Sequence, residues 1–354
     1  MATVGTSVST DTLEEVDLGL LAKVLRPQID PNLTIDALDT ISVGASNRMY
    51  LASTSVGRLI LRVPPRHKTS PTAHDMGREY RILGALDASQ VPHPRAVALC
   101  EDTDVFGAGF LVMEFVDGFN LKVGPNVPEA PNDQERRDFA LEGVTALADL
   151  AAVDWAGIGL ADFGKPEGFL ERQVSRWSTQ LEGYRVRDLP GLDRLTEWLN
   201  ANRPSASAPA IMHGDFTYMN VMFARSRPAR VAAIVDWEQS TIGDPLMDLG
   251  WFLGLWAHQD EQSPVTPPGT QWVTQMPGMP TRDEVVARYA ERSGRDVSAI
   301  GFYQALALFK LVVVLEGNYA KYRNGTSRNS HHADFEWMVP QLVDTALAAA
   351  HAKR

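Results

Sequence analysis

The chain has 354 residues but only one cysteine, Cys100, so no disulfide can form within it and the fold does not depend on oxidation. No His-containing motif flanks this cysteine, and we interpret it as a small buried residue rather than a nucleophile. Excess positive charge is also missing. The formal net charge of −11 argues against nucleic-acid binding, which requires basic surface, and is compatible with a cationic small-molecule substrate.

Long hydrophobic runs are missing as well. The most apolar stretches, near residues 246–256 and 305–315, contain Asp248 and Lys310 and are too short to span a bilayer. The first residues lack the charged-then-apolar pattern of a secretion signal. We therefore expect a cytoplasmic protein without membrane or nucleic-acid partners. The sequence does not indicate an oligomeric state.

A strand-rich segment extends from about residue 35 to 116. Its short apolar runs predict strands over residues 41–43, 49–52, 58–63, 97–100 and 110–116. Between the third and fourth of these, residues 76–86 predict a helix in which Tyr80, Leu83 and Leu86 share one face.

From about residue 118 onward the pattern turns helical. Helices are expected over residues 136–150, 170–181, 192–199, 283–293 and 300–322. The predicted organisation is an N-terminal extension with a helix over 1–37, an N-lobe over 38–117 and a C-lobe over 118–354. A small β-rich N-lobe and a larger, mostly helical C-lobe are typical of the α+β, bilobal, protein-kinase-like fold.

Three polar side chains stand beside short apolar runs in the predicted C-lobe. Asp215 belongs to a His-Gly-Asp turn, Asn220 follows five residues later, and Asp236 closes the apolar run 231–235, which predicts a short buried strand. Phosphoryl transfer needs a carboxylate that orients and deprotonates the attacking hydroxyl, together with hard oxygen ligands for magnesium. The spacing predicts Asp215 as that base and Asn220 with Asp236 as the Mg²⁺ ligands.

These motifs resemble the aminoglycoside phosphotransferase and choline kinase superfamily. They are similar above all to the branch of provisionally assigned aminoglycoside phosphotransferases that includes the kinase-like domains of some acyl-CoA dehydrogenases. The resemblance covers roughly residues 38–325. It is carried by His213-Gly-Asp215-x-x-x-x-Asn220, Asp236-Trp237-Glu238, Gly243-Asp244-Pro245-x-x-Asp248-Leu249, Arg62-Val-Pro-Pro65, Arg78-Glu79-Tyr80 and residues 165–173.

The resemblance implies an ATP- and Mg²⁺-dependent kinase and places further residues near the nucleotide. The Gly-containing turn with Ser46 and Asn47 would cover the phosphates, since backbone N–H groups and both side chains can donate to phosphate oxygens. The Glu114 carbonyl and the Val116 amide would hold adenine. Asp244 and Asp248 would be structural, with Asp244 capping a helix and the pair bracing the catalytic loop.

Arg62 departs from the lysine that many kinases carry on the third strand. Strand alternation puts Ile60 and Arg62 on one face, so the guanidinium can point at a nucleotide. Arginine is permanently charged and can bind phosphate or carboxylate through two N–H groups, so it can fill the role with altered geometry. We predict that Arg62 binds the phosphates and that Glu79, on the following helix, is its ion-pair partner.

The acceptor is poorly marked. An aminoglycoside would make antibiotic resistance the biological role, whereas a hydroxyacyl compound, an aminoalcohol or another hydroxylated metabolite is an alternative acceptor. Residues of this kind are more often core than pocket, but a pocket would be lined by some of Trp237, Glu238, Trp251, Trp256, Asp260, Glu261, Glu316 and Tyr319.

Two other functions compete with the kinase. A metal-dependent hydrolase would use His213, Asp215 and Asp236, although no second histidine stands at ligand spacing. A nucleotide-binding protein without catalysis is suggested only by Arg62. Metal binding without nucleotide would identify the first, and ATP binding without phosphate transfer would identify the second.

Overall fold

The structure is a computed structural model. It describes residues 16–43, 47–65, 75–121, 129–130, 132–327 and 329–352. The chain divides into two compact units, one made of residues 1–80 and 95–115 and the other of residues 81–94 and 116–354. This division separates Phe115 from Val116 and assigns residues 81–94 to the second unit. The domain limits given above stay a prediction.

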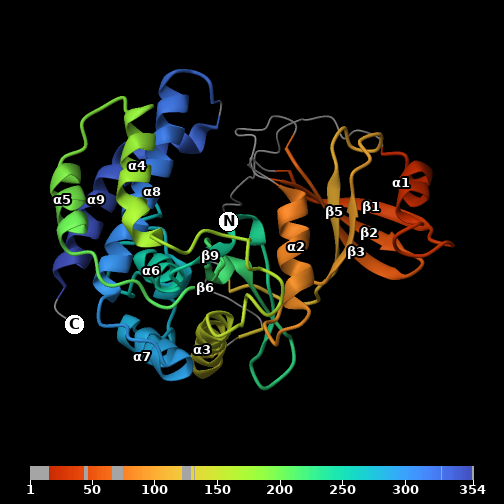
Figure 1. The fold of residues 1–354 in the computed structure, drawn as a ribbon, viewed down its shortest axis with the longest axis horizontal. Helices are drawn as coiled ribbons and strands as arrows, with labels where there is room; N and C mark the ends of the chain where they lie inside the picture. Colours follow the sequence, from red (N-terminus) through yellow and green to blue (C-terminus); the bar gives the residue numbers. More distant parts are fainter. Residues whose placement is uncertain are drawn as a thin grey trace. The chain divides into compact units, whose positions relative to one another are not determined.

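The first unit is built on a five-stranded antiparallel sheet of order β1-β2-β3-β5-β4 (Figure 1). The strands are β1 (Ile35–Val43), β2 (Arg48–Thr54), β3 (Gly57–Val63), β4 (Ala96–Cys100) and β5 (Phe110–Glu114). All five predicted strands are therefore confirmed; the first four are longer than predicted, and the fifth ends at Glu114 instead of Val116. Helix α1 (Leu18–Leu25) begins after Asp17, whose carboxylate accepts from the N–H groups of Gly19 and Leu20.

Strand β3 has two distinct faces. Its apolar residues Leu59, Leu61 and Val63 belong to the buried core that also includes Leu21 of α1. Arg62 lies on the opposite face because successive side chains of a strand alternate. The two-faced pattern predicted for this strand is thus confirmed.

Helix α2 (Met76–Leu86) has the predicted bounds but not the predicted face. Leu83 and Leu86 are fully buried, whereas Tyr80 is 37% exposed. Glu79 is 1% exposed and stands four residues before Leu83, so it shares the buried face. The assignment of Tyr80 to that face was wrong, because the buried position next to Leu83 is taken by the charged residue Glu79 and not by the tyrosine.

The second unit is mostly helical. Its helices are α3 (Asp133–Leu150), α4 (Phe169–Glu182), α5 (Leu192–Ala201), α6 (Leu246–Gly254), α7 (Arg282–Ser293), α8 (Ile300–Arg323) and α9 (Phe335–His351). Helix α8 packs against α4, α5, α6 and α9. Figure 1 shows α8 beside α4 and α9. Among the described residues it is the one helix long and apolar enough to cross a membrane, but 67% of its most apolar window is buried inside the protein.

Two glycines let α6 approach α8 closely. A Cβ atom on Gly250 would lie 2.5 Å from the backbone carbon of Tyr303, which no side chain tolerates. A Cβ on Gly254 would lie 3.2 Å from the Leu308 side chain. Helix α6 is therefore fixed to α8 along its length, and with it the position of Asp248.

Two small antiparallel sheets carry the acidic motifs. One joins β6 (Ala210–Met212) to β9 (Thr241–Gly243), and the other joins β7 (Val221–Phe223) to β8 (Val231–Ile234). The predicted strand over 231–235 is confirmed as β8. Strands of three residues, such as β6, are too short to produce an alternating pattern, so the sequence did not predict them.

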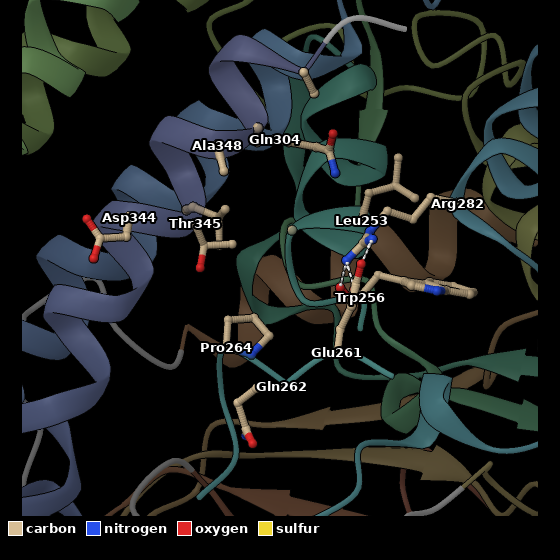
Figure 2. Close-up of a pocket in the computed structure, with 14 residues that line it drawn as sticks. Leu253, Trp256, Glu261, Gln262, Pro264, Arg282, Gln304, Asp344, Thr345 and Ala348 are labelled. Atoms are coloured by element: carbon tan, nitrogen blue, oxygen red, sulfur yellow. Dashed lines mark hydrogen bonds and ion pairs between the residues drawn. The ribbon is translucent and has the colours of Figure 1, made fainter. Parts of the chain in front are cut away.

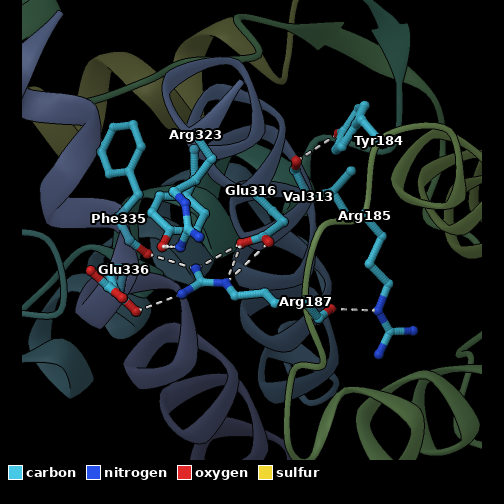
Figure 3. A network of polar contacts seen from close by, with 9 residues as sticks. Tyr184, Arg185, Arg187, Val313, Glu316, Arg323, Phe335 and Glu336 are labelled. Carbon is cyan, nitrogen blue, oxygen red and sulfur yellow. Dashed lines mark hydrogen bonds and ion pairs between the residues drawn. The ribbon is translucent and has the colours of Figure 1, made fainter. Parts of the chain in front are cut away.

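A buried ion pair ties the segment between α4 and α5 to α8 (Figure 3). Arg187 Nη2 lies 2.7 Å from a carboxylate oxygen of Glu316, which is fully buried. The same guanidinium donates to the backbone oxygens of Phe335 and Glu336 at 2.9 and 2.8 Å and lies 4.1 Å from the Tyr319 ring centre. Glu316 and Tyr319 therefore hold the helices together, in agreement with the core interpretation.

Candidate active site

Asp215 lies on the turn that follows β6. The turn requires glycine at position 214, where φ is +85° and a Cβ atom would come within 2.5 Å of the Gln239 backbone oxygen. Asp248 of α6 holds the same turn through hydrogen bonds. Its two carboxylate oxygens accept hydrogen bonds from the N–H groups of His213 at 2.6 Å and Gly214 at 2.8 Å. The predicted bracing of this loop by Asp248 is confirmed.

Asp244 stabilises the start of α6. Its carboxylate accepts from the Leu246 N–H at 3.1 Å, as the predicted cap would. The other oxygen accepts from the Ser207 N–H at 2.9 Å and the Tyr303 hydroxyl at 2.8 Å. One residue thus joins the helix start, the segment before β6 and α8.

His213 is fully buried and both of its ring nitrogens are engaged. Its Nδ1 accepts from the Asp215 N–H at 3.3 Å, which requires the proton to be on Nε2, and Nε2 donates to the Val235 oxygen at 2.9 Å. Neither nitrogen is available to a metal. The alternative function as a metal-dependent hydrolase therefore has no histidine ligand, because the His213 ring supports the turn instead.

Asn220 connects Asp215 to Asp236. The Asn220 side-chain amide donates to the Asp215 backbone oxygen at 2.8 Å and to its carboxylate at 3.3 Å. The Asn220 backbone oxygen accepts from the Val235 N–H at 2.9 Å, so Asp236 follows directly beside it. Asp236 adopts φ +70°, a left-handed conformation uncommon outside glycine and often found at functional sites.

The environment of Asp215 suits a proton acceptor. Burial raises the pKa of its carboxyl to about 6, and the nearby Asp236 carboxylate acts in the same direction. Lys310, the Asn220 amide and the Trp251 indole act in the opposite direction. A carboxylate with a pKa near neutrality accepts a proton more readily than an exposed one while remaining largely ionised at physiological pH.

The residues fit a magnesium ion held jointly with phosphates. Since the Asn220 amide nitrogen is turned to Asp215, the amide oxygen points away from it, as a metal ligand must. Asp236 adds a carboxylate beside it. No group of three or more His, Cys, Asp or Glu side chains that could hold a metal occurs among the described residues. Mg²⁺ keeps several waters and takes phosphate oxygens, so two protein ligands suffice.

The predicted nucleotide residues of the first unit are only partly grouped. Arg62 and Glu79 form a buried ion pair at 3.0 Å, which confirms the predicted partnership. Asn47 is also buried, at 3% exposed, and Glu114 ends β5 beside Arg95. Ser46 lies outside the described residues. Val116 belongs to the second unit, together with Asp215, Asn220 and Asp236.

Lys310 of α8 is a site residue that the sequence did not reveal. Its ammonium donates to the Gly214 backbone oxygen at 3.3 Å and to Gln239 Oε1 at 3.4 Å, next to Asp215. The available signal was a single cation within an apolar helix, where charged residues usually have a partner or a role.

A separate pocket of about 500 Å³ lies between α8, α9 and the segment after α6 (Figure 2). Trp256 and Glu261, both among the predicted pocket residues, line it. Arg282 forms an ion pair with Glu261 and donates to the Trp256 backbone oxygen, so these two charges of the pocket are already paired. Trp237 is core instead, and its indole donates to the Ile234 oxygen at 2.8 Å.

Residues 38–294 match the sequence profile of the Phosphotransferase enzyme family, so the chain belongs to that family. The chain is 31% identical over 311 residues to acyl-CoA dehydrogenase family member 11 of Homo sapiens, a match that covers 86% of this chain and 39% of the human protein. The chain spans about two fifths of the length of such curated relatives.

Solved structures confirm the predicted α+β, kinase-like fold. A protein from Ralstonia eutropha, provisionally described as an aminoglycoside phosphotransferase, superposes with a TM-score of 0.77 and 28% identity, covering 96% of this chain and 100% of that one. An aminoglycoside phosphotransferase in ternary complex with ADP and hygromycin B gives a TM-score of 0.58 at 15% identity, covering 94% and 99%. The resemblance predicted from the motifs is confirmed, and the chain is a kinase-like phosphotransferase.

Proposed function

We propose that this chain transfers the terminal phosphate of ATP, in the presence of Mg²⁺, to a hydroxyl group of a small molecule. The observation that carries the proposal is the hydrogen-bonded grouping of Asp215 with Asn220, with Asp236 directly beside them, within one compact unit. A base and two hard oxygen ligands at one place are the minimum that phosphoryl transfer requires.

Asp215 is the proposed base. In the transfer the acceptor oxygen forms the new bond to phosphorus while the bond between phosphorus and the departing ADP breaks. The hydroxyl proton passes to the Asp215 carboxylate. The raised pKa of this group, caused first by burial, supports the role, and the Asn220 amide keeps the carboxylate oriented.

Asn220 and Asp236 are the proposed magnesium ligands. When bound there, Mg²⁺ would supply charge neutralisation for the phosphate oxygens. The turn geometry at Asp236 and the hydrogen bond that orients the Asn220 amide fix these ligands before any ion arrives. Such preorganisation means that binding need not reorder the site.

Arg62 is the proposed phosphate-binding cation of the first unit, with Glu79 holding its guanidinium in place. Ser46, Asn47, Glu114 and Val116 remain proposed nucleotide contacts. Nucleotide complexes of solved relatives, such as the one with ADP and hygromycin B, support ATP as the phosphate donor.

The acceptor class has two main candidates. The ternary complex of a structural neighbour contains hygromycin B, which favours an aminoglycoside. The curated relatives are acyl-CoA dehydrogenase family members, which favours a hydroxyacyl compound. An aminoalcohol or another hydroxylated metabolite is the further alternative.

The test replaces the proposed base. Purified protein is incubated with Mg-ATP and a panel of aminoglycosides, aminoalcohols and hydroxyacyl thioesters, and phosphate addition is followed by mass spectrometry. Asp215→Ala should lower kcat by about 100- to 10,000-fold while binding of Mg-AMP-PNP stays within about twofold. Asp193→Ala, which removes an exposed aspartate in the first turn of α5, serves as the control.

Normal turnover in Asp215→Ala would remove this residue from the mechanism. Binding of Mg-AMP-PNP by the unaltered protein without phosphate transfer to any member of the panel would favour the nucleotide-binding protein without catalysis. Product formed in the absence of ATP would support the hydrolase.

A further inference from the structure

Lys310 places a positive charge beside Asp215. Besides its hydrogen bonds to Gly214 and Gln239, its ammonium lies 5.0 Å from the ring centre of Trp251 and 5.8 Å from that of Trp177. Both distances are typical of cation–π contacts, which stabilise the charged form of lysine. Burial lowers the pKa of the lysine below its usual range, while Asp215 and Asp248 act in the opposite direction.

The charge of Lys310 is not cancelled by an ion pair. Although all three side chains are described, no ion pair within 4.0 Å joins the ammonium to Asp215 or to Asp248. Both oxygens of Asp248 already accept backbone N–H groups. Lys310 donates its hydrogen bonds to two neutral oxygens, of Gly214 and Gln239, so the ammonium can still attract an anion.

Lys310 is electrostatically coupled to the proposed base, Asp215. Asp215 is influenced both by Asp236 and by Lys310, whereas the charges acting on Lys310 are Asp215, Asp248 and Arg176. Any group that reaches Asp215 therefore also comes close to the Lys310 ammonium. A phosphate acceptor must reach Asp215 from the side away from the metal-bound phosphates.

Helix α4 adds a second cation and a ring next to Lys310. Arg176 is exposed, and its guanidinium lies 5.3 Å from the ring centre of Trp177. The same ring also faces Lys310. The half-buried Trp177 thus offers apolar surface flanked by two positive charges.

We infer that Lys310 receives an anionic group of the phosphate acceptor, so that the acceptor is a hydroxylated carboxylate or phosphate rather than a polycation. Its apolar part lies against Trp177, its anionic group contacts Lys310 with Arg176 as an outer cation, and its hydroxyl reaches Asp215. This inference rests on the proposed function. It disfavours aminoglycosides, whose ammonium groups would have to approach Lys310 and Arg176.

The terminal phosphate of the nucleotide is another source of negative charge for Lys310. The contacts of Lys310 and Arg176 with the same Trp177 ring favour the acceptor instead, because an acceptor offers an apolar part for that ring as well as an anionic group. Binding of Mg-AMP-PNP distinguishes the two sources, because a lysine that holds the nucleotide must weaken nucleotide binding when it is removed.

The experiment compares the unaltered protein with Lys310→Met, Lys310→Arg and the control Lys321→Met, which removes an exposed lysine of the same helix. Short-chain hydroxy acids and their neutral amides are assayed as acceptors, and binding of the same compounds in the presence of Mg-AMP-PNP is measured by calorimetry. We expect the acid to have a KM or Kd about tenfold or more below that of its amide. Lys310→Met should abolish that preference, and Lys310→Arg should restore most of it.

Each outcome decides the matter. Equal binding of acid and amide by the unaltered protein, a preference for an aminoglycoside, or no binding of any anionic probe would overturn the inference. If kcat of Lys310→Met falls equally for the acid and the amide, Lys310 only supports the turn at Gly214 and does not bind the acceptor. Weakened Mg-AMP-PNP binding in Lys310→Met would assign its charge to the nucleotide. Failure of the unaltered protein to bind Mg-AMP-PNP would instead count against the proposed function.

Discussion

Arg62 of β3 and Glu79 of α2 form an ion pair in which both side chains are removed from water, with 4% and 1% exposed. Burying one charge without its partner is far more costly than burying the pair. We expect Glu79→Gln to lower the free energy of unfolding by about 3–5 kcal/mol, measured by urea denaturation. The same variant should weaken Mg-AMP-PNP binding, because the guanidinium would no longer be held in place.

Arg62→Lys is the matched variant for this pair. It keeps the charge and should therefore retain most of the stability, while the loss of the forked guanidinium should weaken Mg-AMP-PNP binding. A Glu79→Gln protein that unfolds at the same urea concentration as the unaltered one would show that the pair contributes nothing to stability.

The second prediction concerns Asp248, whose two oxygens accept the N–H groups of His213 and Gly214. Asn in its place would present an N–H group to one of these donors. We expect Asp248→Asn to lower the free energy of unfolding by about 2–3 kcal/mol and to reduce kcat, because the turn that carries Asp215 loses its support. Thermal unfolding and the mass-spectrometric transfer assay measure the two effects.

Asp283→Asn serves as the control, since it makes the same change at an exposed aspartate in the first turn of α7. Full activity of the Asp248→Asn protein would mean that β6 and His213 alone position the loop.

A third prediction concerns pH. Arg137 donates a hydrogen bond to Glu284, the Thr281 N–H donates another, and together they lower the pKa of Glu284 to about 2. This value lies below the unfolded-state value of about 4.3. The stabilisation is therefore complete above about pH 4.3 and is lost as the pH falls towards 2.

Glu284→Gln should remove this stabilisation, which we place at about 1 kcal/mol at most because Glu284 is 42% exposed and solvent screens the pair. The stability difference between the two proteins, measured by urea denaturation at several pH values, should be largest near neutrality and shrink below pH 4. Glu182→Gln, at an exposed position of α4, controls for general charge effects. A difference that grows on acidification would contradict the prediction.

The fourth prediction compares two glycines in helices. Gly250→Ala would force a Cβ atom against the Tyr303 backbone and should lower the free energy of unfolding by about 1–3 kcal/mol, since backbone cannot move aside cheaply. Gly84→Ala is the matched control, because its Cβ would meet nothing within 4 Å and alanine favours helix by about 1 kcal/mol. Chemical denaturation should show opposite signs. A neutral Gly250→Ala would indicate that α6 can shift on α8.

Most elements were predictable because their patterns are strong and local. The hairpin strands β2 and β3 contain short apolar runs bounded by turns, and α8 is a long apolar run. Helix α9 was missed although its buried residues recur at helical spacing, because Pro340 stands inside it and proline normally ends a helix. The strands β6, β7 and β9 have three residues each and show no period.

The candidate site divides in the same way. Asp215, Asn220 and Asp236 are close in sequence, so their spacing carries the prediction. Lys310 meets this loop from α8, about a hundred residues later, and only packing brings it there. A single charge in an apolar run gives no indication of which loop it will face, so this contact required the structure.

The Arg187–Glu316 contact has a consequence for redesign of the acceptor specificity. It anchors the segment that follows α4 onto α8, and these are the two helices that carry Trp177 and Lys310. This ion pair thus holds together the two helices that would flank the proposed acceptor. New selectivity should come more readily from exchanging side chains such as Arg176 than from respacing the helices, and libraries that leave residue 187 untouched should yield more folded members.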